Sequence, residues 1–157
     1  MNAKQFTSTK IFIGFPCCHR QPSHPGHCRF VHGYERSFKM WFASNELTQQ
    51  WFVADFGALK EVRAWLVEMF DHTCLVNEDD PELATFRDLH ERSIIDLRIV
   101  PNVSMESTSK LVLEQVNRIL LKQTGERAWC FRVETRENEK NSAMYEISRE
   151  TPPPVQA

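Results

Sequence analysis

The chain has 157 residues, of which 41% are hydrophobic and 25% charged, a composition typical of a globular protein with one sizeable core. Its 19 basic and 21 acidic residues give a formal charge of −2, so we expect no nucleic-acid partner. No apolar run approaches the roughly 20 residues that cross a bilayer. The sequence therefore predicts a single domain over 1–157, ordered from about 10 to 149, with no membrane partner.

The N-terminal stretch, MNAKQFTSTK, contains no apolar segment of the kind found in secretory signals. The five cysteines are an odd number, and two of them, Cys17 and Cys18, are adjacent, which suits no regular disulfide framework. We therefore expect reduced thiols and a cytoplasmic protein.

Two extended runs come first. Residues 10–19, KIFIGFPCCH, alternate in the manner of a strand, which would place five side chains on one side: Ile11, Ile13, Phe15, Cys17 and His19. Residues 30–43, FVHGYERSFKMWFA, form a second extended run. The segment RQPSHPGHC between them has two prolines and a glycine and is expected to be a loop.

The period changes to three and four residues from Asp55 onwards, which predicts a helix with Asp55 as its N-cap. A loop follows from Asp71, then a short helical pattern over 82–90 and a short extended piece, SIIDLRIV. A second long helix is expected over 104–123, because Ser104 can cap its start and Gly125 stands where helices end.

The last two strand candidates are AWCFRVETRE and NSAMYEIS, joined by charged residues that indicate a solvated turn. Residues 151–157, TPPPVQA, suggest a frayed tail. The main elements run strand, strand, helix, helix, strand, strand, and the short links favour antiparallel pairing. We therefore predict an α+β domain with a four-stranded antiparallel sheet and two helices packed on one face.

Several residues carry potential chemistry. Histidines on neighbouring strands can share a metal ion, so His19 and His32 are candidate ligands, although two half-buried histidines bonded to backbone would fit as well. Cys28, in a loop with glycine and proline, is the thiol expected to be most exposed. Asp71 and His72 place a carboxylate beside an imidazole in a loop, where the alternative is a histidine that caps the preceding helix.

Six motifs occur in one order along the chain: FPCCHR, CRFVHGY, ADFGALK, FDHTCLVN, PNVSMES and FRVETRE. From about Phe12 to Tyr145 the chain resembles the family of 6-pyruvoyl-tetrahydropterin and 6-carboxy-tetrahydropterin synthases. The resemblance implies a T-fold subunit that assembles as a homotrimer or homohexamer with sites at the interfaces. It also implies a lyase acting on a reduced pterin, 7,8-dihydroneopterin triphosphate, with the 6-carboxy product leading to queuosine.

The resemblance further implies residue roles. The catalytic thiol matches Cys28, and the pair that relays its proton, from a neighbouring subunit, matches Asp71 and His72. The carboxylate that anchors the pterin ring matches Glu134, with Thr135 completing the motif. The acidic residue at the start of the second helix matches Glu106, for which a structural role at the helix terminus is equally open.

The family holds Zn²⁺ with three histidines, of which His19 and His32 match two. Tyr34 stands in place of the third, and a neutral phenol is a poor zinc donor because phenols ionise only near a pKa of about 10. Three alternatives are open: Tyr34 binds as a phenolate, His24 or His27 replaces it, or no metal binds. Two functions are therefore open as well. One is a lyase of the 6-carboxy-tetrahydropterin synthase type, and the other is an altered or inactive paralogue that binds a pterin or purine-like ligand.

Residues 81–101, PELATFRDLHERSIIDLRIVP, form an insertion relative to compact bacterial members of the family. Because they follow Asp71 and His72 closely, they could cover the substrate pocket or alter its selectivity. A surface hairpin or a trimer contact is the structural alternative.

Overall fold

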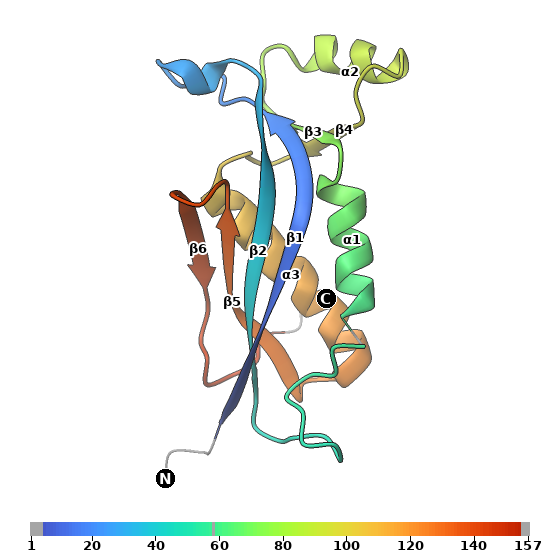
Figure 1. Ribbon diagram of the computed structural model, residues 1–157, viewed down its shortest axis with the longest axis vertical. Coiled ribbons are helices and arrows are strands. Elements are labelled where there is room, and N and C mark those ends of the chain that lie inside the picture. Colours follow the sequence, from blue (N-terminus) through green and yellow to red (C-terminus); the bar gives the residue numbers. More distant parts are fainter. Residues whose placement is uncertain (1–4, 58, 155–157) are drawn as a thin grey trace.

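The computed structural model describes residues 5–57 and 59–154. Its strands and helices are β1 Phe6–His19, η1 His27–Arg29, β2 His32–Ser44, α1 Lys60–Phe70, β3 Thr73–Asn77, α2 Leu83–Glu91, β4 Leu97–Val100, α3 Met105–Thr124, β5 Ala128–Arg136 and β6 Ser142–Glu146. The strands form one sheet in the order β4-β3-β1-β2-β5-β6. In Figure 1, α3 passes behind the strands and α1 runs alongside β1, while α2 lies apart from both, near β3 and β4.

The predicted antiparallel strands β1, β2, β5 and β6 are confirmed, but the predicted number of strands is wrong. The sheet has six strands, because β3 pairs with β1 and β4 pairs with β3, both in parallel. The short helical pattern over 82–90 and the extended piece SIIDLRIV are confirmed as α2 and β4, so the described residues contain three α-helices, whereas the predicted architecture counted two. All five residues of β3, TCLVN, are buried, so this strand shows no alternation of polar and apolar residues that could predict it.

A β-bulge in β1 changes which side chains face the helices. The register with β2 shifts between Phe12 and Phe15, and Gly14 adopts a left-handed φ of 88° in the shifted segment. Ile11 and Ile13 are therefore 56% and 64% exposed on the face away from Phe15. The expectation that all five alternating residues of 10–19 share one side is wrong, because it assumed an unbroken strand.

The core lies between this sheet and the helices α1 and α3. The ring of Phe38 on β2 lies 5.6 Å from that of Phe15 on β1 and 4.8 Å from that of Phe70 on α1, centroid to centroid. Burying a side chain of this size contributes about 1.5–3 kcal/mol. The rings thus fix α1 against the halves of β1 and β2 that lead to the histidines.

The two long helices differ in how well their starts were predicted. The Oγ of Ser104 accepts a hydrogen bond from the amide of Ser107 at 3.2 Å, and Gly125 ends α3 with a φ of 60°, as predicted. Asp55 is not the N-cap of α1, which begins at Lys60. The Asp55 side chain instead accepts a hydrogen bond from the amide of Gly57 and closes a local turn.

The insertion over 81–101 forms α2 and β4 rather than a hairpin. Phe86 of α2 packs against Cys74 and Val76 of β3, which point to the face opposite α1 and α3. An ion pair of 2.6 Å between Arg20 and the buried Asp80 fixes the start of the insertion to the end of β1. The segment is therefore an integral part of the sheet.

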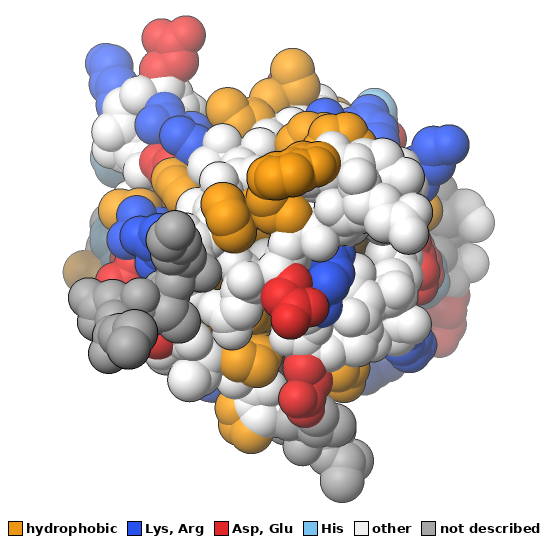
Figure 2. Space-filling view, turned by 90° about the horizontal axis from the view of Figure 1, so that it is seen from below, with side chains coloured by type: hydrophobic (Ala, Val, Ile, Leu, Met, Phe, Trp, Pro, Cys, Tyr) orange, Lys and Arg blue, Asp and Glu red, His pale blue; other side chains and the backbone are white. Residues whose placement is uncertain are grey.

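The end of the molecule opposite α2 has many apolar side chains at its surface. Figure 2 shows apolar side chains gathered at this end, where the loop between β2 and α1 exposes Trp51, Phe52 and Phe56. Pro152 and Pro153 are half-buried and line a cavity of about 240 Å³ with Trp129, so they are not a frayed tail. Residues 155–157 of that prediction lie outside the described residues. Within the described residues, every helix is too short or too polar to cross a membrane.

Candidate metal and substrate site

Two histidines meet where β1 ends and β2 begins. His19 and His32 are partners in the strand register, and their ring centroids lie 4.5 Å apart. His19 is 7% exposed, and burial, followed by the charges of Arg36 and His32, lowers its pKa to about 3. Its ring is therefore a neutral imidazole around neutrality, which is the form that binds a metal ion.

A backbone hydrogen bond orients the ring of His32. Its Nδ1 lies 2.6 Å from the carbonyl oxygen of Phe30, an acceptor, so Nδ1 is the donor in this contact. Nε2 is then the ring nitrogen left for a ligand role, an arrangement common around protein metal sites. Gly33 permits this pairing of the strands, because a Cβ there would lie 2.8 Å from the carbonyl oxygen of Cys17.

A carboxylate lies close to the two imidazoles. In the described part of the chain, one group of three potential ligands occurs, with donor atoms of His19, His32 and Glu137 all within 4.8 Å of one another. The ring of Tyr34 lies 5.7 Å from that of His32 and is 39% exposed. The alternatives His24 and His27 do not belong to this group; His24 accepts a hydrogen bond from Gly26 instead.

A buried arginine lies behind the histidines. Arg36 is 1% exposed and donates to Thr108 Oγ1 at 2.8 Å and to the carbonyl of Val103 at 2.9 Å, while a third contact reaches Nδ1 of His19 at 3.4 Å. Burial lowers its pKa, but a guanidinium stays protonated near neutrality. Sequence reasoning missed Arg36; the signal was a charged residue on the same side of β2 as Tyr34 and Phe38.

The proposed catalytic thiol lies at the same end of the sheet. Cys28 is half-buried in η1, and its carbonyl accepts a hydrogen bond of 2.7 Å from the amide of Gln21. Gln21 is two residues beyond His19, so the loop returns Cys28 towards the histidines. The backbone therefore brings residue 28 back beside the end of β1.

The acid–histidine pair lies elsewhere in the chain. His72 Nδ1 is 2.6 Å from Asp71 Oδ1, and the His72 side chain is exposed. The amide of His72 donates to the carbonyl of Pro16 at 2.7 Å, three residues before His19 and hence about 10 Å back along β1. The carboxylate of Asp71 and the imidazole of His72 are thus hydrogen-bonded to each other. Cys28, by contrast, lies beyond the end of β1, away from this pair.

An open hollow of about 550 Å³ lies beside His72, and the insertion forms much of its wall through His90 and residues 93–96. Cys18 and Cys74 also line it, as register partners on β1 and β3. A hydrogen bond between the two thiols lowers the pKa of Cys18 to about 7 and raises that of Cys74. The two cysteines are 56 residues apart in the sequence, so only the parallel register of β1 and β3 reveals the pair.

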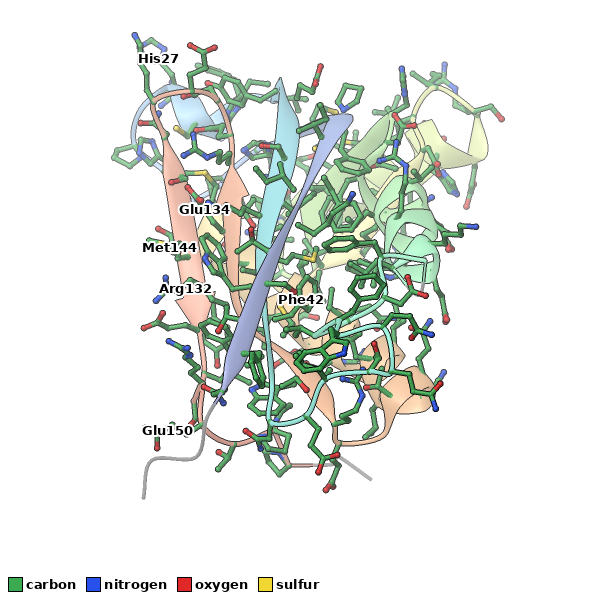
Figure 3. The ribbon with its side chains drawn as sticks, turned by 60° about the horizontal axis from the view of Figure 1, so that its bottom comes forward. His27, Phe42, Arg132, Glu134, Met144 and Glu150 are labelled. Carbon is green, nitrogen blue, oxygen red and sulfur yellow. The ribbon has the colours of Figure 1, made fainter. Side chains whose placement is uncertain are left out.

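The predicted substrate residues lie on different faces. Glu134 is on the sheet face away from α1 and α3, opposite Lys39, and its Oε1 lies 3.1 Å from Arg136 Nε. Figure 3 shows Glu134 with Arg132 and Met144 along β5 and β6. Thr135 is fully buried on the other face and accepts a hydrogen bond of 2.8 Å from Ser109. Their roles in binding substrate remain predictions.

Glu106 is exposed in the first turn of α3. Its carboxylate is therefore free to interact with the helix terminus or with a ligand.

The mixed, curled sheet with α1 and α3 on one face and a histidine cluster at its rim defines a T-fold protein of the pterin-synthase type. A family model described as 6-pyruvoyl tetrahydropterin synthase matches residues 9–148. The chain therefore belongs to the 6-pyruvoyl tetrahydropterin synthase family.

Curated relatives with a more specific name match part of the chain. The 6-carboxy-5,6,7,8-tetrahydropterin synthase of Rickettsia felis is 35% identical over 72 residues, which are 45% of this chain and 52% of that protein. The protein of the same name from Rickettsia conorii is 33% identical over the same shares. The chain thus spans about half the length of the curated relatives that it matches.

Solved structures match nearly the whole chain. An uncharacterized protein from Wolinella succinogenes has a TM-score of 0.77 at 21% identity and covers 92% of this chain and 99% of its own. The 6-pyruvoyl tetrahydropterin synthase of Caenorhabditis elegans has a TM-score of 0.64 at 17% identity, with 94% and 99% covered. At these identities the two structures establish the fold.

Proposed function

We propose that the protein is a lyase of the 6-carboxy-tetrahydropterin synthase type acting on 7,8-dihydroneopterin triphosphate. The observation that carries this proposal is the retention of Cys28, Asp71 and His72 in a chain whose curated relatives bear that name. The bonded Asp71 and His72 support it, because the carboxylate orients an imidazole that can take up and release a proton.

The separation of Cys28 from Asp71 and His72 supports a site shared between subunits. A thiol is mostly protonated near neutrality, with an ordinary pKa of about 8.5, and needs a base close by before it can accept a proton from substrate. In this proposal the exposed His72 of one subunit serves Cys28 of its neighbour. The active protein is then a homotrimer or a homohexamer.

The residues at the end of β1 fit a divalent metal ion. His32 keeps its Nε2 outside the backbone hydrogen bond, His19 is a neutral imidazole, and a carboxylate oxygen of Glu137 lies close to both. A bound Zn²⁺ would supply Lewis-acid polarisation of the side-chain oxygens of the substrate. The imidazoles would orient it, and Cys28 would move the proton.

Glu134 is proposed to anchor the pterin ring. A carboxylate can accept two hydrogen bonds from the adjacent donors of an amino-pyrimidine edge. Glu134 is 8% exposed in a single chain, and Arg136 contacts one of its oxygens, so it is already oriented before a ligand arrives. Because it lies on the sheet face away from His19, substrate would have to bind between chains to reach both.

A second candidate function is favoured by two residues. Tyr34 replaces a histidine of the family motif, and the guanidinium of Arg36 contacts His19. The missing histidine and the positive charge beside His19 would both weaken a three-histidine zinc site. A paralogue that holds a pterin or purine-like ligand through Glu134, without turnover, would retain the fold and lose the reaction.

Turnover of 7,8-dihydroneopterin triphosphate by the zinc-supplied protein tests the proposal, with the 6-carboxy product and acetaldehyde measured by mass spectrometry. Cys28→Ala should lower the rate by about 10²–10⁴-fold and retain pterin binding. Cys130→Ala, in the buried core, is the matched cysteine control. Pterin binding without turnover in the unmodified protein would favour the second function, and full activity of Cys28→Ala would exclude Cys28 as the proton carrier.

A further inference from the structure

We propose that Glu137, not Tyr34, completes the metal site, so that two imidazoles and one carboxylate hold a divalent ion beside Arg36. The inference rests on the proposed function only in assuming that His19 and His32 are ligands. It assigns the third position to a residue in the turn between β5 and β6, which the sequence indicated to be no more than a solvated turn.

The geometry favours the carboxylate. Donor atoms of His19, His32 and Glu137 lie within 4.8 Å of one another, so a modest closure would bring all three to one ion. Tyr34 follows His32 by two residues on the same strand, and its ring stands edge-on to the imidazole at 5.7 Å. Tyr34 is also 39% exposed, which leaves its phenol in contact with solvent.

The turn that carries Glu137 is held by its own hydrogen bonds. The Glu137 amide donates to the carbonyl of Asn141 at 3.2 Å, and the Asn138 side chain accepts from the amides of Lys140 and Asn141. Glu137 is half-buried, whereas Glu139 and Lys140 are exposed. The backbone therefore separates one inward carboxylate from the solvated charges beside it.

Charge gives an independent reason for a carboxylate at this position. Three neutral imidazoles would leave a divalent ion unshielded next to the buried guanidinium of Arg36, and like charges in a buried site repel strongly. The negative charge of Glu137 acts favourably on the protonated form of Arg36. The same carboxylate would offset part of the repulsion between Arg36 and a bound ion.

The donor set also indicates which ions would bind. Two imidazoles and a carboxylate occur in zinc sites and in facial sites for Fe²⁺, and they bind other first-row divalent ions. Nδ1 of His19 can accept from Arg36 only while it is unprotonated and not bound to an ion. The contact must therefore be released if Nδ1 binds the ion, or if Nε2 binds it and Nδ1 carries the proton. We therefore expect a site for Zn²⁺ or Co²⁺ without thiolate ligation.

Co²⁺ titration of the chelator-treated, full-length protein tests the inference by absorption and by metal analysis. The unmodified protein should bind one equivalent with visible d–d bands and without the thiolate charge-transfer absorption that cysteine ligation would add. Glu137→Gln should weaken binding by at least about 100-fold, since loss of an outer partner alone typically costs 10–100-fold. Tyr34→Phe and the matched control Glu139→Gln should stay within about twofold.

The inference would be overturned by unchanged affinity in Glu137→Gln, by loss of affinity in Tyr34→Phe, or by a thiolate band in the unmodified protein. Glu137 lies in a turn, so its substitution should leave the fold intact. Circular dichroism of each variant checks that it does, and a change in metal affinity can then be assigned to the lost ligand. Uptake below about a tenth of an equivalent in the unmodified protein would also overturn it. Turnover of the pterin substrate is measured separately, so failure of the metal assignment and failure of the proposed function are distinguishable.

Discussion

The two histidine-bearing regions of the sheet differ in burial and in their neighbours. His19, at the end of β1, is 7% exposed and contacts a buried guanidinium, whereas the side chain of His72, at the start of β3, is exposed and paired with Asp71. The first region is assembled within one chain by packing. The second is held mainly by one hydrogen bond and is open to another molecule.

Because the two regions differ in burial, we expect them to respond differently to mutation. A change at a buried site alters stability as well as chemistry, because packing and desolvation set its properties. A change at an exposed pair should alter chemistry alone.

The largest expected effect is on turnover, through the exposed pair. Asp71→Asn should lower the rate by about 10²–10⁴-fold, because an amide cannot orient His72 or balance its charge as a carboxylate does. Thermal unfolding should shift little, with the free energy of unfolding changed by less than about 0.5 kcal/mol. A large loss of stability would show that the pair is structural and would remove the distinction between the two regions.

The next effect is an acid sensitivity that belongs to the buried region. The folded pKa of His19 is about 3, below its ordinary value of 6.5, so the unfolded chain binds the additional proton and stability falls as pH falls between these values. Between pH 6.5 and pH 5 this amounts to about 1.5 kcal/mol.

Urea unfolding at several pH values measures this loss. His19→Gln should remove that part of the pH dependence, and His72→Gln, at the exposed position, should leave it unchanged. An identical slope in His19→Gln and the unmodified protein would contradict a buried neutral His19.

A smaller effect is expected from restoring the family's histidine. Tyr34→His should strengthen Zn²⁺ binding by about tenfold, because its position next to His32 allows an imidazole to join the existing donors. Competition with a coloured chelator measures the change. No change would mean that residue 34 does not reach the ion.

Much of the fold could be predicted from the sequence where its periodicity is unbroken. The strands β2, β5 and β6 and the helix α3 carry clear alternating or three-to-four-residue patterns, and Ser104 and Gly125 limit the helix as expected. The fully buried β3 shows no such pattern. The bulge at Gly14 places Ile11 and Ile13 on the sheet face opposite Phe15, and a prediction from strict alternation of side chains cannot anticipate such a bulge.

The candidate site was predicted best where its residues are close in sequence. The bonded Asp71 and His72 and the paired His19 and His32 follow from motifs on one or two strands. Glu137 could not be recognised, since it reaches the histidines only through the pairing of β5 with β2. Strand pairing between distant parts of the chain determines which side chains meet at the site, and it leaves no pattern in the sequence around Glu137.

In the proposed assembly one subunit supplies Cys28 and another supplies Asp71 and His72, and subunit complementation measures whether the site is shared in this way. Cys28→Ala and Asp71→Asn chains with different affinity tags are co-expressed, and mixed assemblies are isolated through both tags. Each variant alone should be nearly inactive, whereas the isolated mixed assemblies should regain about a quarter (hexamers) to a third (trimers) of the normal activity, because that share of their interfaces joins two intact parts. Mixed assemblies no more active than the separate variants would contradict a shared site.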